Sequence, residues 1–136
     1  MRVDCFLDTN VLIYAASANL TEERKKIRAI ELLASSFGTS TQVIQEFYAA
    51  STRKPDKPLT PLEALEWIER LERQPCVVID PSLIRTAIAI SQRYLIAYWD
   101  GAILAAAERL GAEIVYTEDL NHGQRYGPVQ VINPFL

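Results

Sequence analysis

The chain has 136 residues, of which 49% are hydrophobic and 23% charged, with a net charge of -3 and a pI near 5.2. This length and composition are typical of a globular protein, and we expect one domain over residues 1–136. No apolar run is long enough to cross a bilayer and no signal-like segment is present, so we expect a cytoplasmic protein without a membrane partner. The acidic balance argues against binding nucleic acid through a broad basic surface. It leaves open contact with phosphates through cations held by clustered carboxylates.

Taken in chain order, apolar strand-like runs alternate with helical patterns. We expect strands over 2–7, 76–79, 113–116 and 129–132, and a further short strand that ends near residue 40. We expect helices over 9–17, 21–34, 41–53, 60–74 and 98–110, and another that begins at residue 81. Residues 53–58 are predicted to form a loop and residues 124–128 a turn. This alternation predicts a three-layer α/β/α fold with a mainly parallel central sheet of four to five strands.

The two cysteines and the one histidine narrow the chemistry of any site. Cys5 and Cys76 both lie in apolar, strand-like runs, which is typical of buried reduced thiols and does not make a zinc site. His122 is the only histidine, so neither a histidine-rich metal site nor a Ser-His-Asp triad is expected.

The turn Asp8-Thr9-Asn10 joins the first strand to the first helix, at the edge where parallel α/β folds place their ligands. Asp8 can cap the helix, or it can be a metal ligand or general base. We expect Thr9 or Asn10 to supply the cap while Asp8 faces a metal ion.

Four acidic residues stand out from the other acids of the chain: Asp8, Glu46, Asp100 and Asp119. Asp8 and Asp119 follow two strands whose carboxyl ends should meet at one edge of the sheet. Asp100 points along an apolar helix stripe beside Ile103, although a first-turn acid can also be stabilised by the helix dipole. Glu46 flanks an apolar helix face and can equally be a boundary residue that reaches water. We expect the four to converge on one site.

A cluster of carboxylates cannot remain fully ionised without a cation, and oxygen-only ligands favour Mg²⁺ or Mn²⁺. Such a site acts on phosphates by activating water and neutralising the phosphoryl oxygens. Without metal, we expect the site to hold at least one proton near neutral pH, because neighbouring carboxylates raise one another's pKa. Thr9, Asn10, Thr117 and Asn121 could orient the ligands, or could serve only as caps and turn residues.

Four segments resemble the motifs of the PIN-domain ribonucleases, and within them the VapC-type toxins of bacterial toxin–antitoxin pairs. The segments are FLDTNVL at 6–12, STQVIQEFY at 40–48, YWDGAILAAA at 98–107 and YTEDLNHG at 116–123, and the likeness continues to VINPF at 131–135. Each segment contains one of the four acids, in the family's order. Gly101 departs from the pattern, since alanine is more usual after the third acid.

The resemblance implies a divalent-metal endoribonuclease that is inhibited by a cognate antitoxin and is a homodimer. It carries Asp8, Glu46, Asp100 and Asp119 over as catalytic metal ligands, with Thr117 as a helper. Two other interpretations remain open: a metal-dependent phosphatase or DNA nuclease with the same chemistry, and a non-catalytic α/β binding module.

Two surfaces are candidates for partners. RNA could meet basic side chains, each of which could also be an ordinary surface charge: Arg53, Lys54, Lys57, Arg85, Arg93 and Arg125. An antitoxin helix could dock on surplus apolar residues, which could equally be core: Leu32, Leu33, Phe47, Trp67 and Leu71.

Overall fold

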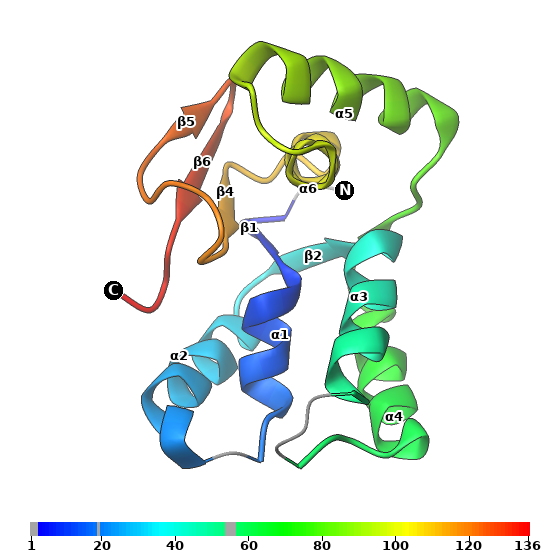
Figure 1. The fold of residues 1–136 in the computed structure, drawn as a ribbon, viewed down its shortest axis with the longest axis vertical. Helices are drawn as coiled ribbons and strands as arrows, with labels where there is room; N and C mark the ends of the chain where they lie inside the picture. The colour runs from blue at the N-terminus through cyan, green and yellow to red at the C-terminus, as the bar shows by residue number, and fades with distance from the viewer. Residues whose placement is uncertain (1–2, 19, 54–56) are drawn as a thin grey trace.

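The computed structural model describes residues 3–18, 20–53 and 57–136. Its elements (Figure 1) are β1 (Cys5–Leu7), α1 (Thr9–Ala16), the 3-10 helix η1 (Leu20–Glu22), α2 (Glu23–Leu33), β2 (Phe37–Ser40), α3 (Thr41–Ser51), α4 (Pro61–Leu71), β3 (Cys76–Val77), α5 (Pro81–Tyr94), α6 (Tyr98–Arg109), β4 (Ile114–Tyr116), β5 (Arg125–Tyr126) and β6 (Val129–Ile132). The predicted alternation of strands and helices is confirmed, although several elements are shorter than predicted.

The strands of the described residues form one six-stranded sheet in the order β3-β2-β1-β4-β6-β5. β1 lies between β2 and β4 and is parallel to both, with Leu7 opposite Tyr116. β5 is antiparallel to β6, with Tyr126 opposite Val129. This strand falls in the segment predicted as a turn, because two residues leave no alternating pattern to read. The sheet is therefore mainly parallel as predicted, with one strand more than the expected four to five.

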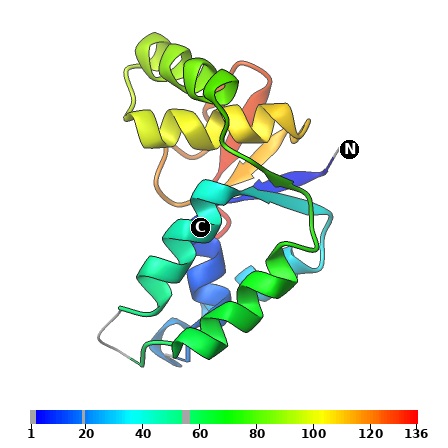
Figure 2. The same cartoon turned by 90° about the vertical axis from the view of Figure 1, so that its right-hand side faces the viewer.

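The helices cover the two faces of the sheet, so the predicted three-layer α/β/α architecture is confirmed. α5 and α6 lie on one face, while α1 to α4 lie on the other (Figure 2). α6 packs directly on β2, β4 and β6, and α5 packs on α6. Strand residues such as Phe6 and Val115 are fully buried between these layers, as are Leu12 of α1 and Leu104 of α6.

Two helix starts follow directly from their sequence. Thr60 caps α4 in a reciprocal capping box with Glu63, and Pro61 occupies the first turn. Asp80 caps α5 by accepting a hydrogen bond from the backbone of Leu83 at 2.8 Å.

One helix turns a different face inward from the one its apolar residues would suggest. Ile84 and Ile88 of α5 are 38% and 47% exposed, whereas Ala87 is fully buried. A Cβ on Gly101 would lie 2.6 Å from the carbonyl oxygen of Ala87. At this point the two helices approach too closely for a larger side chain at position 101.

Most residues considered for an antitoxin groove are core residues. Leu32, Phe47 and Leu71 are at most 4% exposed. Leu33 and Trp67 are partly buried and line a cavity of about 90 Å³. Among the described residues, no helix is both long and apolar enough to span a membrane.

Candidate functional site

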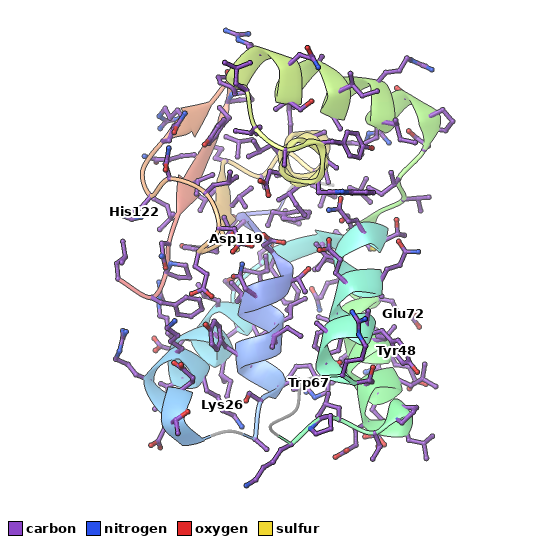
Figure 3. The ribbon with its side chains drawn as sticks, in the orientation of Figure 1. Lys26, Tyr48, Trp67, Glu72, Asp119 and His122 are labelled. Carbon is purple, nitrogen blue, oxygen red and sulfur yellow. The ribbon has the colours of Figure 1, made fainter. Side chains whose placement is uncertain are left out.

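The acids at the ends of β1 and β4 meet because these strands are parallel neighbours. Leu7 pairs with Tyr116, so Asp8 and the segment that follows Tyr116 leave the sheet at the same edge. Figure 3 shows Asp119 beside the start of α1. The side-chain amide of Asn10 in α1 donates to Asp119 Oδ2 at 3.1 Å. The expected meeting of the first and fourth acids is therefore present.

Asp8 caps α1 itself, which corrects the expected division of roles. Its Oδ1 accepts a hydrogen bond from the backbone of Thr9 at 2.7 Å. Its Oδ2 accepts from the Thr117 hydroxyl at 2.9 Å. Because a carboxylate has two oxygens, one group can both cap the helix and face the site. Neither Thr9 nor Asn10 supplies the cap.

Thr117 is the centre of the hydrogen-bond network, and its hydroxyl is fully used. Its oxygen accepts from Asn10 Nδ2 and from the backbone N–H of Asp119, each at 3.1 Å. With both acceptor positions occupied, the hydroxyl proton must go to Asp8. Thr117 is 1% exposed. It therefore fixes the Asp8 carboxylate from inside the protein.

Asn10 and Thr9 each carry a buried oxygen that has no partner in the part of the chain that the structure describes. Asn10 uses its nitrogen on Thr117 and Asp119, and this fixes the orientation of its amide. Its Oδ1 and Thr9 Oγ1 find no hydrogen-bond partner among the described residues. Buried oxygens of this kind normally find a partner, such as a bound water.

Burial raises the pKa of Asp8 from its ordinary 3.8 to about 6. The hydrogen bonds from Thr9 and Thr117 act against this shift, and the negative charges of Asp119 and Glu46 add to it. The expected direction is confirmed, but burial contributes more than the neighbouring carboxylates. With a pKa near 6, Asp8 is mostly ionised at pH 7 and binds its proton mainly at lower pH, whereas we expected a bound proton near neutral pH.

The remaining two acids approach the site from helices. Asp100 is in the first turn of α6 and half-buried, and its pKa is raised by burial and then by the charge of Asp119. Glu46 is exposed on α3, but its charge contributes to the raised pKa of Asp8. Three pairs thus link the four acids electrostatically: Asp8 with Asp119, Asp8 with Glu46, and Asp100 with Asp119.

Gln42 connects the two acid-bearing helices and was not anticipated from the sequence. It is 8% exposed, and its Nε2 donates to the backbone oxygen of Trp99 at 3.2 Å. Trp99 precedes Asp100, and Gln42 lies one turn before Glu46 on α3. The position of Gln42 next to the buried Val43, near the start of a helix, is the signal that could have revealed it.

Several predicted residues lie outside this network. Asn121 donates to Gln124 Oε1 at 2.8 Å, which is the turn role left open for it. Arg53 donates to Ala49 O near the end of α3, and Lys57 is exposed just beyond that helix. The other described basic candidates are exposed on α5 (Arg85 and Arg93) and on β5 (Arg125), and Lys54 lies outside the described residues. The described basic candidates therefore do not form one patch (Figure 1).

The donor atoms of the cluster suit a hard divalent cation. In the described part of the chain, the salt bridges join Lys25 to Glu118, Arg28 to Glu31 and Arg109 to Asp80, so none neutralises the four acids. The described part of the chain contains no group of three acidic, histidine or cysteine side chains already arranged to hold a metal ion. Oxygen-only ligands favour Mg²⁺, which keeps several of its waters and needs few direct carboxylate contacts.

Fold and site together define an α/β protein with an acidic, oxygen-only cluster at the carboxyl edge of a parallel sheet. Residues 5–127 match the family model of the PIN domain, and the chain belongs to this family. A comparison with curated proteins gave no match.

Solved structures from bacterial toxin–antitoxin systems share the fold. A toxin–antitoxin complex from Klebsiella pneumoniae has a TM-score of 0.70 at 19% identity, covering 96% of this chain and 97% of that one. Mycobacterium tuberculosis VapC20, a sarcin-ricin loop cleaving toxin, has a TM-score of 0.66 at 19% identity, covering 85% and 89%. DNA-bound VapBC from Salmonella typhimurium has a TM-score of 0.65 at 18% identity, covering 95% and 96%. At these identities the likeness is one of fold.

Proposed function

We propose that this chain is a divalent-metal-dependent endoribonuclease and the toxin of a toxin–antitoxin pair. One observation carries the proposal: a PIN domain in which four acids from four separate segments interact electrostatically, with no cationic partner among the described side chains. The similar folds of solved toxins support the same conclusion.

Asp8, Glu46, Asp100 and Asp119 would hold the cation, either Mg²⁺ or Mn²⁺. Asp119 and Glu46 are exposed, so their side chains can turn toward the buried Asp8 when a cation binds. A bound cation would supply an activated water and positive charge for the phosphoryl oxygens. Binding should also release a proton wherever Asp8 is protonated, because its pKa is raised.

The chain's own residues set the geometry of this site. Thr117 holds Oδ2 of Asp8, and the backbone of Thr9 holds its Oδ1, so the first ligand cannot rotate freely. Asn10 holds Asp119 toward Asp8. The buried oxygens of Thr9 and Asn10, which have no hydrogen-bond partner among the described residues, could hold an ordered water beside Asp8.

RNA is the substrate class that we favour over DNA or a phosphomonoester, because VapC20 is described as cleaving the sarcin-ricin loop. Arg53 follows the C-terminal end of α3, just beyond Ser51 and Thr52, and Glu46 lies within this helix. Arg53, Lys57 and, as a prediction, Lys54 would extend the RNA path from the acids along this helix. Arg85, Arg93 and Arg125 remain secondary candidates for RNA contacts.

The test compares turnover of RNA, DNA and a phosphomonoester with Mg²⁺ or Mn²⁺, and then with EDTA. RNA should be cleaved preferentially, and EDTA, Asp8→Asn and Asp100→Asn should each abolish cleavage. Asp80→Asn is the matched control, because Asp80 also caps a helix but pairs with Arg109. RNA cleavage that survives EDTA and both site substitutions would contradict the mechanism.

The antitoxin would dock an amphipathic helix on the apolar surface of α2 and α4. Ile30 of α2 is 48% exposed, and Leu33 and Trp67 line a cavity between the two helices. A protein from the neighbouring gene should inhibit RNA cleavage, and Ile30→Glu should restore it. The homodimer stays a prediction, which sedimentation of the purified chain would check.

A further inference from the structure

Glu118 lies between two residues of the candidate site, Thr117 and Asp119, but its side chain contacts a different group of residues. Its Oε1 accepts a hydrogen bond from the Tyr14 hydroxyl at 2.8 Å, and its Oε2 accepts from Lys25 Nζ at 3.3 Å. Lys25 Nζ also donates to the Tyr14 oxygen at 3.1 Å. The three side chains therefore form a closed triangle that joins α1, α2 and the segment after β4.

This triangle is shielded by aromatic rings. The rings of Tyr14 and Phe135 meet edge to face, with centroids 5.0 Å apart. Lys25 Nζ lies 4.8 Å from the Tyr14 centroid and 5.7 Å from that of Phe135. The side chains of Lys25 and Glu118 are only 26% and 25% exposed. Partial burial and shared hydrogen bonds make this ion pair stronger than an open surface pair.

The triangle acts on the same helix face as the candidate site. Asn10 and Tyr14 are one turn apart on α1, so their side chains leave the helix on the same side. Asn10 holds Thr117 and Asp119, while Tyr14 holds Glu118 between them. Three consecutive residues are thus fastened to one helix by two side chains.

Electrostatic repulsion makes such a fastening necessary. Asn10 holds Asp119 beside the start of α1, where Asp8 caps the helix, and like-charged carboxylates that lie close together repel one another. Asp119 is exposed and follows a short strand, so repulsion would tend to move its segment away from α1. The attachment of Glu118 to Tyr14 and Lys25 opposes that movement.

We propose that Glu118 is a positioning residue which, held by Tyr14 and Lys25, keeps the segment of Asp119 against α1, where Asp119 and Asp8 could bind one divalent cation together. Only the metal-binding part of this proposal rests on the proposed function. The attachment itself exists without metal and can be measured without it.

The first measurement is amide hydrogen exchange of Asp119 in the metal-free protein, where this N–H donates to Thr117 Oγ1. Tyr14→Phe keeps the ring packing and removes the hydroxyl, and it should accelerate exchange at Asp119 about tenfold. Exchange at Val115, in the core of β4, should not change. Tyr94→Phe is the control, because Tyr94 makes a similar edge-to-face contact with Tyr126 at 5.1 Å.

The second measurement is the Kd for Mn²⁺, which Glu118→Ala should raise about tenfold, as expected for loss of a contact that orients a ligand. Glu118→Gln keeps an oxygen for the Tyr14 hydroxyl and should retain most of the affinity. Wild-type exchange at Asp119 in Tyr14→Phe, together with a wild-type Kd in Glu118→Ala, would overturn the proposal. If the wild-type chain bound no Mn²⁺, the proposed function would fail, and the exchange measurement alone would decide the role of Glu118.

Discussion

Gly101 lies directly against the backbone of Ala87. A Cβ at position 101 would be 2.6 Å from the Ala87 carbonyl oxygen and 3.3 Å from the Cβ of Ser91. Gly101 is also the position where the chain departs from the alanine that its family pattern favours. The close contact between α5 and α6 explains this departure, because α6 with alanine could not keep its present distance from α5.

Gly101→Ala should therefore lower the free energy of unfolding, although alanine favours helices by about 1 kcal/mol. Overpacking typically costs about 1–3 kcal/mol, which outweighs that gain. The substitution should also weaken Mn²⁺ binding, because α6 carries Asp100. Urea denaturation of the variant, with the exposed Thr86→Ala as control, checks the sign. A variant at least as stable as wild type would show that α5 can move away at no cost.

The raised pKa of Asp8 predicts an unusual pH dependence of stability without metal. The folded state binds a proton at a pKa of about 6 and the unfolded state at 3.8, so the folded state holds more protons between these values. The contribution of Asp8 to stability is present below pH 3.8 and is lost as the pH rises through 6. It amounts to about 3 kcal/mol across this window. Urea denaturation in EDTA between pH 4.5 and 7.5 should show this trend in wild type and not in Asp8→Asn.

Thr117→Val tests the hydroxyl at the centre of the network. Valine keeps the shape but removes a donor to the buried Asp8 and an acceptor for Asn10 and Asp119. We expect a loss of about 2–3 kcal/mol at pH 7 and a further rise in the pKa of Asp8, since a hydrogen bond to its charged form disappears. Thr117→Ser keeps the hydroxyl and should lose about 1 kcal/mol or less. Equal stability of the two variants would contradict the assigned network.

Gln42→Leu tests the connection between α3 and α6. Loss of the hydrogen bond to Trp99 should reduce RNA cleavage about tenfold, because the helices that carry Glu46 and Asp100 would no longer be joined by this contact. Gln45→Leu, on an exposed position of the same helix, should cleave RNA at the wild-type rate. Two variants with the same rate would show that Gln42 has only a packing role.

The parts of the fold that follow from local patterns were predictable. β1 and β4 are apolar runs that end at small polar residues, and parallel pairing then places Asp8 and Asp119 at one edge. β5 was not predictable, because its two residues pair only when Gly127, at a φ of 62°, turns the chain back into β6. Such a strand has no pattern of its own.

The details of the site depended on partners that are distant in the sequence. The expectation that Thr9 or Asn10 caps α1 was wrong because Thr117 binds the second oxygen of Asp8 and leaves the first for the cap. The role of Glu118 depends on Tyr14, 104 positions earlier in the chain. No local spacing indicates a contact of that kind.

The pairing of β1 with β4 also has a consequence for how the protein is made. Asn10 and Asp119 are 109 positions apart, and the pairing of β1 with β4 brings their segments to the same edge of the sheet. A chain still emerging from the ribosome holds Asp8, Glu46 and Asp100 long before it holds Asp119, and its first strand then lacks β4 as a neighbour. The complete acidic cluster therefore cannot form until Asp119 has been synthesised, 109 positions after Asn10.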